Sequence, residues 1–200
     1  LLIVALGLAI TFGVMRVINL AHGELIMIGA YTAYVVTTVL DLPYALAIVA
    51  AFCSATIIGL VMEVLVIKRL YGRPLETLLA TVGISIILQE MVRLIFGPVA
   101  KGVAAPFGQS FSIGGVIIPY YRLFVVIFSV LLVAAIVLIL YKTTFGVQLR
   151  SVSQNRHMSE CLGINSSVMD TVTFSFGSGL AGVAGAIIAP VRPVSPTLGS

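Results

Sequence analysis

A group of polar side chains lies between two apolar stretches in RVINLAHGE, residues 16–24. Within it, Asn19 and His22 can each donate and accept hydrogen bonds, and Glu24 accepts them. Such groups are costly to expose to lipid, so we expect them to face protein, water or a solute. They indicate either a polar loop at the membrane surface, with Arg16 as a basic anchor, or a break in a helix that lines the path of a polar solute.

Gln89, Glu90 and Arg93 form a second polar group, inside the apolar stretch 78–96. Glu90 and Arg93 are three residues apart, a spacing that brings side chains together on a helix. We therefore expect a salt bridge at a helix end or an anchor at the membrane interface. Gln89 is uncharged and can both donate and accept hydrogen bonds, which makes it a further candidate for the solute path.

A third group, GVQLRSVSQNRHMSECLGIN at residues 146–165, predicts a short helix in a polar segment. Asn155 is a favoured N-terminal cap, and Gly163 is favoured just after a helix C-terminus. The helix between them would carry an apolar face, which predicts docking into a partner's groove or packing on the chain's own membrane domain. The residues expected to take part are Asn155, Arg156, Met158, Glu160, Cys161, Leu162 and Gly163.

Two further patterns lie in the last apolar stretch, residues 168–190, and just before it. Ser167 followed by Asp170 predicts a capping box at the start of a helix. Small residues that recur on one helical face let neighbouring helices approach closely in lipid, so they predict helix packing. The residues on this face are Ser178, Gly182, Gly185 and Ala189.

The composition excludes most soluble and catalytic classes of protein. Hydrophobic residues make up 60% of the chain and charged residues 9%, and the mean hydropathy is +1.20, far from the values of soluble domains. The basic residues are scattered through short loops, so we do not expect nucleic acid as a partner. Cys53 and Cys161 are isolated, and neither a nucleotide-binding motif nor a nucleophile–base pair occurs. We expect no catalytic residue, metal or cofactor in this chain, and any ATP would be hydrolysed by another one.

Six apolar stretches must position these groups, and each predicts a helix, because a helix satisfies its own backbone in lipid. Residues 42–67, 78–96, 123–141 and 168–190 are long enough to span a bilayer, whereas 25–40 is short and 1–12 is cut by the start of the sequence. We predict an all-α polytopic membrane protein, a multi-helix transmembrane bundle with broken helices. It would form one domain over residues 1–200, a fragment truncated at both ends of a larger permease.

Basic residues in short loops stay on the cytoplasmic side. Two loops carry most of them, Lys68, Arg69 and Arg73 in one, and Lys142, Arg150 and Arg156 in the other. We therefore predict a cytoplasmic loop at residues 142–166 and an outward-facing segment at 97–122, in which FSIGGVII (111–118) forms a small hairpin or irregular structure. A small-residue helix followed by a polar, turn-prone segment occurs at 7–24 and again at 177–200, an arrangement typical of transporters with broken helices.

The motif INLAHGELIMIGAYTAYV, residues 18–35, resembles the signature of the permease family of branched-chain amino acid ABC importers. LRSVSQNRHMSECLGI, residues 149–164, resembles the ATPase-coupling loop of that family. Within the family, LYGRPLETLLATVGISIILQ (70–89) and VSPTLGS (194–200) are more similar to the urea permease subunit than to the leucine-type subunit. The resemblance implies a multi-pass protein of the bacterial inner membrane that moves urea or a short amide. The near alternative is a branched-chain amino acid.

The resemblance also implies partners in the lipid bilayer and on either side of it. An external solute-binding protein would deliver the solute, and a second homologous permease subunit would complete the path. Two cytoplasmic ATPase subunits would bind ATP and drive transport through residues 155–163. Two alternatives stay open: a passive channel, which needs no coupling helix, and an ion-coupled secondary transporter, in which Glu24 or Glu90 would titrate or bind a cation.

Overall fold

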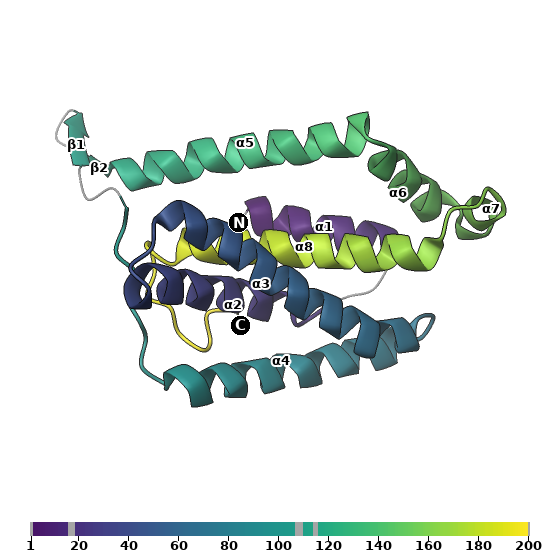
Figure 1. Ribbon diagram of the computed structural model, residues 1–200, viewed down its shortest axis with the longest axis horizontal. Coiled ribbons are helices and arrows are strands. Elements are labelled where there is room, and N and C mark those ends of the chain that lie inside the picture. Colours follow the sequence, from purple (N-terminus) through teal and green to yellow (C-terminus); the bar gives the residue numbers. More distant parts are fainter. Residues whose placement is uncertain (1, 16–18, 107–109, 114–115, 200) are drawn as a thin grey trace.

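Long apolar helices form the frame of the protein (Figure 1). The computed structural model describes residues 2–15, 19–106, 110–113 and 116–199. Within these residues, 4 helices are long and apolar enough to cross a membrane. They are α3 (Tyr44–Leu65, followed by the 3-10 turn η2, Ile67–Leu70), α4 (Pro74–Phe96), α5 (Tyr120–Lys142) and α8 (Ser166–Ile188). The predicted spans and the all-α membrane fold are confirmed.

Two shorter helices precede these spans. Helix α1 covers Leu2–Met15, and α2 covers His22–Tyr34 before it widens into the π-helical turn η1, Val35–Val39. Helix α2 thus begins three residues before the predicted stretch 25–40, and Glu24 lies in its first turn and not in a break. A carboxylate is favourable there because it faces the positive end of the helix dipole.

Helix α8 lies at the centre of the bundle, with α1, α2 and α3 packed against it (Figure 1). The small residues of its predicted packing face are all buried: Ser178, Gly182, Gly185 and, just past its end, Ala189. A Cβ atom at Gly182 would overlap the carbonyl oxygen of Ala51 on α3, and one at Gly185 would overlap that of Ile26 on α2. The backbones of three helices therefore approach as closely as residues without bulky side chains allow.

Helix α5 lies on the outside of the bundle, and most of its side chains are exposed (Figure 1). At its start, the Tyr121 hydroxyl donates a hydrogen bond to the Ile187 carbonyl near the end of α8, at 2.7 Å. Strands β1 (Ser110–Ile113) and β2 (Val116–Pro119) precede it and pair antiparallel. Of the two alternatives left open for residues 111–118, a small hairpin or irregular structure, the strand pairing supports the hairpin. Residues 114–115 lie outside the described residues.

Helices α6 (Thr144–Gln154) and α7 (Arg156–Cys161) connect α5 to α8. The Asn155 side chain caps α7 by accepting a hydrogen bond from the Met158 amide at 3.1 Å, and Gly163 follows with φ of +82°, as a helix-ending glycine does. The predicted capping box at Ser167 and Asp170 is wrong. Asn165 caps α8 by accepting from the Val168 amide at 3.1 Å, because Ser167 already lies inside the first turn.

Candidate substrate path and coupling site

The start of α2 lies at the level of the middle of the spans, well inside the bundle. Its Glu24 side chain accepts a hydrogen bond at 3.0 Å from Ser85, the central residue of α4. The His22 ring Nε2 donates to the Val4 carbonyl of α1 at 3.3 Å. In the connection before α2, the Asn19 side chain accepts from the Ala21 amide at 3.0 Å. Helix α2 is therefore a half-length helix whose N-terminus is at mid-depth, a feature of transporter binding sites.

A row of polar side chains on α4 faces this N-terminus. Thr81, Ser85 and Gln89 are four residues apart and so share one face of the helix. Thr81 accepts from the Leu20 amide at 3.3 Å, and Gln89 donates to Glu24 at 2.7 Å. The structure thus brings the predicted path residue Gln89 against Glu24. Thr81 and Ser85 could have been predicted as part of the site, because they lie eight and four residues before Gln89 and so share its helix face.

Glu24 is only 2% exposed, although it carries a carboxylate. Its Oε1 atom accepts hydrogen bonds from Ser85 and Gln89, and its Oε2 atom has no partner among the described residues. A buried carboxylate oxygen without a donor is costly, so this atom is suited to receive a donor from outside the chain. Asn19 and His22 are buried as well, whereas Arg16 lies outside the described residues. The role of all these residues in a solute path stays a prediction.

The segment after α8 folds back into the bundle toward the same point (Figure 1). Val194 forms an antiparallel bridge with Lys101, with both backbone hydrogen bonds at 2.8 Å. Further on, Gly199 lies against Gly23 so closely that a Cβ atom on either residue would overlap the backbone of the other. The two similar sequence segments, 7–24 and 177–200, therefore meet in space beside the start of α2.

Helix α7 presents an apolar face to its surroundings. Met158 and Leu162 are 61% and 73% exposed, and Cys161 is exposed beside them. Ser159, on the opposite face, is buried and shares a 2.8 Å hydrogen bond with Ser151 of α6. None of the described residues covers this apolar face. Docking into a partner's groove and packing on the membrane domain both stay predictions.

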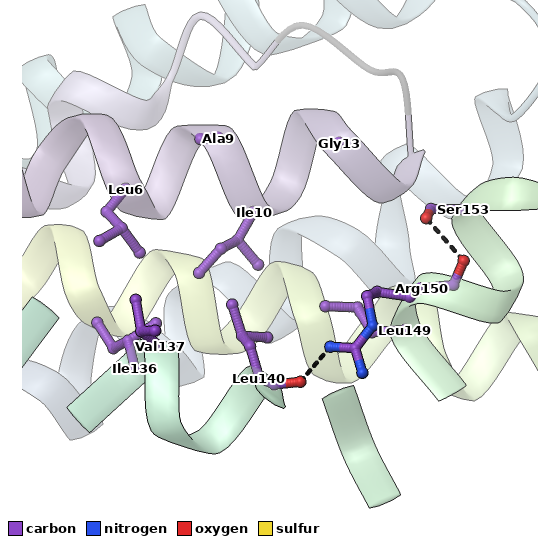
Figure 2. A pocket seen from close by; sticks show the side chains of 10 residues that line it. All are labelled: Leu6, Ala9, Ile10, Gly13, Ile136, Val137, Leu140, Leu149, Arg150 and Ser153. Carbon is purple, nitrogen blue, oxygen red and sulfur yellow. Dashed lines mark hydrogen bonds between the residues drawn. The ribbon is translucent and has the colours of Figure 1, made fainter. Parts of the chain in front are cut away.

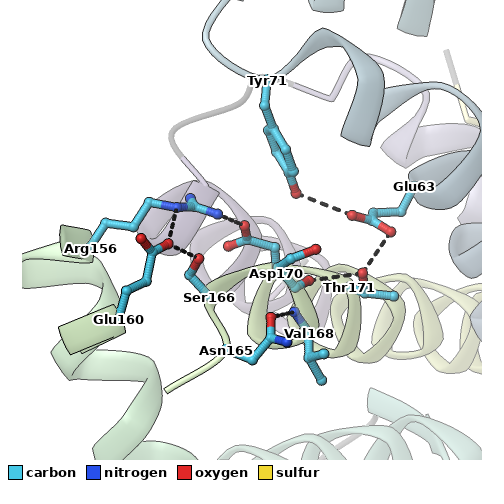
Figure 3. A network of polar contacts seen from close by, with 10 residues as sticks. Glu63, Tyr71, Arg156, Glu160, Asn165, Ser166, Val168, Asp170 and Thr171 are labelled. Atoms are coloured by element: carbon cyan, nitrogen blue, oxygen red, sulfur yellow. Dashed lines mark hydrogen bonds and ion pairs between the residues drawn. The ribbon is translucent and has the colours of Figure 1, made fainter. Parts of the chain in front are cut away.

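The polar face of α7 is joined to two membrane helices by a network of charged and hydroxyl groups (Figure 3). Arg156 forms an ion pair with Asp170 of α8, which is fully buried, and its Nε lies 3.8 Å from Glu160. Glu160 in turn accepts a hydrogen bond from Ser166 at the start of α8. The first two turns of α8 are therefore joined to Arg156 and Glu160 of α7 by charged contacts, which are stronger than neutral ones.

The network continues to α3 through Tyr71, which follows the turn η2. The Arg156 guanidinium lies over the Tyr71 ring, 5.6 Å from its centre, and the Tyr71 hydroxyl donates to Glu63 at 3.3 Å. Thr171 of α8 also donates to Glu63, at 2.8 Å. Burial, together with the carboxylates of Asp170 and Glu63, raises the pKa of the Tyr71 hydroxyl, so it stays a donor. This contact also places the two basic loops, 68–73 and 142–156, at one end of the bundle.

Glu63 is a part of this site that the sequence did not single out. It interrupts an apolar stretch and is completely buried, at 0% exposure. The sequence did contain a signal for Glu63, because it is the lone charged residue in the predicted span 42–67 and a charge inside a span is costly. Glu90 and Arg93, in contrast, form the expected pair at 2.5 Å on an exposed face of α4.

The family described as "Branched-chain amino acid transport system / permease component" matches residues 1–197. The chain belongs to this family. It is 30% identical over 201 residues to the high-affinity branched-chain amino acid transport system permease protein BraD of Pseudomonas aeruginosa, covering 93% of this chain and 65% of that protein. A probable branched-chain amino acid transport permease protein LivH of Methanocaldococcus jannaschii is 30% identical, and the LivH permease of Escherichia coli is 28% identical. No solved structure matches.

Membership of the branched-chain amino acid permease family bears on several predictions. The multi-pass membrane location is confirmed, and the relatives are transport permeases and not enzymes. The closer likeness to urea permeases is not supported, because these relatives are named for branched-chain amino acids, the alternative solute. The chain spans 65% of the length of these relatives, so what the whole protein does is a matter for proposal.

Proposed function

We propose that this chain is part of the membrane-spanning permease subunit of an ABC importer for branched-chain amino acids. The observation that carries the proposal is the family match over residues 1–197. Such an importer would combine this subunit with a second homologous permease, two ATPase subunits that bind ATP, and an external solute-binding protein. The chain itself would carry no cofactor and would perform no chemistry.

The solute would pass the N-terminus of α2. An amino acid zwitterion needs an acceptor for its ammonium group and donors for its carboxylate. Glu24 Oε2, buried and without a donor among the described residues, is the acceptor that we assign to the ammonium group. Asn19, His22 and Gln89 would add neutral donors and acceptors around it. Because the site is buried here, the helices around it would have to separate to admit the solute.

Coupling to ATP hydrolysis would take place at α7. Its exposed Met158, Cys161 and Leu162 would dock in a groove of an ATPase subunit, as an amphipathic helix does. Movement of α7 would then act on α8 through Arg156 and Asp170, and on α3 through Tyr71 and Glu63. Because α8 packs against α1 and α2, this movement would reach the half-length helix at mid-depth.

Uptake of labelled leucine and labelled urea by cells that carry the full set of transporter genes tests the proposal. We expect leucine to be taken up and isoleucine and valine to compete with it. This uptake should stop on ATP depletion and should be lost when residues 156–162 are deleted. Urea uptake without leucine uptake would overturn the choice of solute. Uptake that survives the deletion would indicate a passive channel, and uptake that follows an ion gradient and not ATP would indicate a secondary transporter.

A further inference from the structure

A groove between α1, α5 and α6 is lined almost entirely by apolar side chains (Figure 2). It has a volume of about 360 Å³. Leu6 and Ile10 of α1 form one wall, and Ile136 and Leu140 of α5 form the other. Gly13, further along α1, leaves space, because a Cβ atom there would meet no atom within 4 Å.

The groove lies where lipid chains reach it. Helix α5 exposes apolar side chains along most of its length, including Val137 at 43% and Leu138 at 58% beside the groove. Helix α1 carries no charged residue. Empty apolar space forfeits dispersion contacts, so in a bilayer a groove of this kind favours occupation by a hydrocarbon chain.

One end of the groove is basic. Arg150 of α6 lines it and donates a hydrogen bond to the Leu140 carbonyl (Figure 2). Its guanidinium also lies 5.2 Å from the centre of the Tyr141 ring. Lys142 is close in sequence at the end of α5. Among the described residues no carboxylate pairs with Arg150, and neither α1, α5 nor α6 contains Asp or Glu. The guanidinium keeps further N–H donors, in a planar arrangement that matches a phosphate group.

We propose that this groove binds an anionic phospholipid, with one acyl chain between α1 and α5 and the phosphate on Arg150. The two halves of the site match the two halves of the ligand, an apolar channel inside the membrane region and a cation at the end of a span. Basic pockets between transmembrane helices bind anionic head groups in this way. The site is separate from the start of α2 and from the apolar face of α7, so it does not depend on the proposed transport function.

The test uses the assembled transporter with the full-length permease, reconstituted in vesicles of phosphatidylcholine and phosphatidylglycerol and then extracted in mild detergent. Native mass spectrometry counts the phospholipids that stay bound. We expect the wild type to retain phosphatidylglycerol in preference to phosphatidylcholine. Arg150→Gln should reduce this preference about five-fold, the effect of one basic residue near a membrane surface. Its control is Arg122→Gln, which removes the same charge at the opposite end of α5 and should leave the preference unchanged.

A second variant tests the acyl chain. A Cβ atom at position 13 would meet open space, and Leu has a higher helix propensity than Gly, so we expect Gly13→Leu to fold, fill the groove and lose the bound lipid of either head group. Gly83→Leu is the control, because Gly83 also lies inside a helix, on α4, with open space around its Cβ position. Equal lipid retention in Gly13→Leu and Gly83→Leu would overturn the proposal. So would a wild type without bound lipid, as expected if another segment of the full-length protein fills the groove, or displacement of the lipid by inorganic phosphate.

Discussion

Arg156 and Asp170 form an ion pair that joins the surface helix α7 to the buried helix α8 (Figure 3). The Arg156 side chain is 40% exposed and pairs with Oδ2 of Asp170, whereas Asp170 is fully buried and its Oδ1 atom has no hydrogen-bond partner among the described residues. A buried carboxylate needs a partner, so the position of α7 and the stability of α8 depend on each other. A coupling helix requires such a dependence, because its movement has to be passed on to a membrane helix.

Replacing Arg156 with Met should therefore destabilise the protein by about 1–3 kcal/mol, because it leaves Asp170 buried without its cation. Thermal or denaturant unfolding of the detergent-solubilised protein measures this. Arg93→Met is the matched control, and we expect about 1 kcal/mol or less, since Arg93 and Glu90 form an exposed pair. Combining Arg156→Met with Asp170→Asn should restore part of the stability. Strictly additive losses would show that the two residues do not depend on each other.

Gly163→Val should uncouple transport without preventing membrane insertion. Gly163 has φ of +82°, a conformation that a β-branched residue adopts only at a cost of about 1–2 kcal/mol, so the end of α7 would rearrange. We expect leucine uptake to fall while ATPase activity of the assembled transporter continues. The control is Gly97→Val, which also strains a glycine with positive φ, +80°, after α4, in a loop far along the chain from α7. Normal uptake by Gly163→Val would count against a coupling role for α7.

Glu24→Gln separates a path role from a structural one. The amide keeps an oxygen that can accept from Ser85 and Gln89, so the fold and complex assembly should persist. If the carboxylate anchors the solute ammonium group, uptake should fall about tenfold or more, since a charged hydrogen bond contributes about 1.5–3 kcal/mol. Glu90→Gln, on the exposed face of α4, should leave uptake unchanged. Equal uptake by Glu24→Gln and the wild type would remove Glu24 from the path.

Asn19→Leu and His22→Leu test the uncharged polar residues at the start of α2. Each variant removes donors and acceptors near the start of α2, so we expect uptake to be abolished. Assembly of the complex, measured by co-purification of the ATPase subunits, should be retained. Transport at the wild-type rate would place the solute path elsewhere in the bundle.

Gly185→Ala adds only one methyl group but should destabilise the protein strongly. Its new Cβ atom would overlap the carbonyl oxygen of Ile26, and backbone cannot move aside as a flexible side chain does, so we expect a loss of about 1–3 kcal/mol. Gly83→Ala makes the same change inside α4 with open space around it, and should raise stability by about 0.5–1 kcal/mol. Unfolding of both proteins in detergent, side by side, gives the comparison. If Gly185→Ala were as stable as Gly83→Ala, close packing of α8 on α2 would be contradicted.

Whereas the sequence leaves residues 111–118 open between a hairpin and irregular structure, the number of the long helices, their limits to within about four residues, and the caps at Asn155 and Gly163 could be predicted from it. These features are local. A span must satisfy its own backbone within lipid, so about twenty apolar residues are enough to define it, and a cap involves residues three or four apart. The family could be recognised from short motifs for the same reason, while the choice of urea over a branched-chain amino acid, drawn from finer likenesses, gained no support.

Only the tertiary structure decided which polar groups meet. Glu24 and Gln89 are 65 residues apart along the chain, Glu63 and Thr171 are 108 apart, and neither spacing predicts a contact. The contact of Gly23 with Gly199 likewise depends on how the segments are packed. Lipid fixes where a helix must be apolar, but it does not fix which neighbour shields a buried charge, because that follows from the packing of α8 against the other helices.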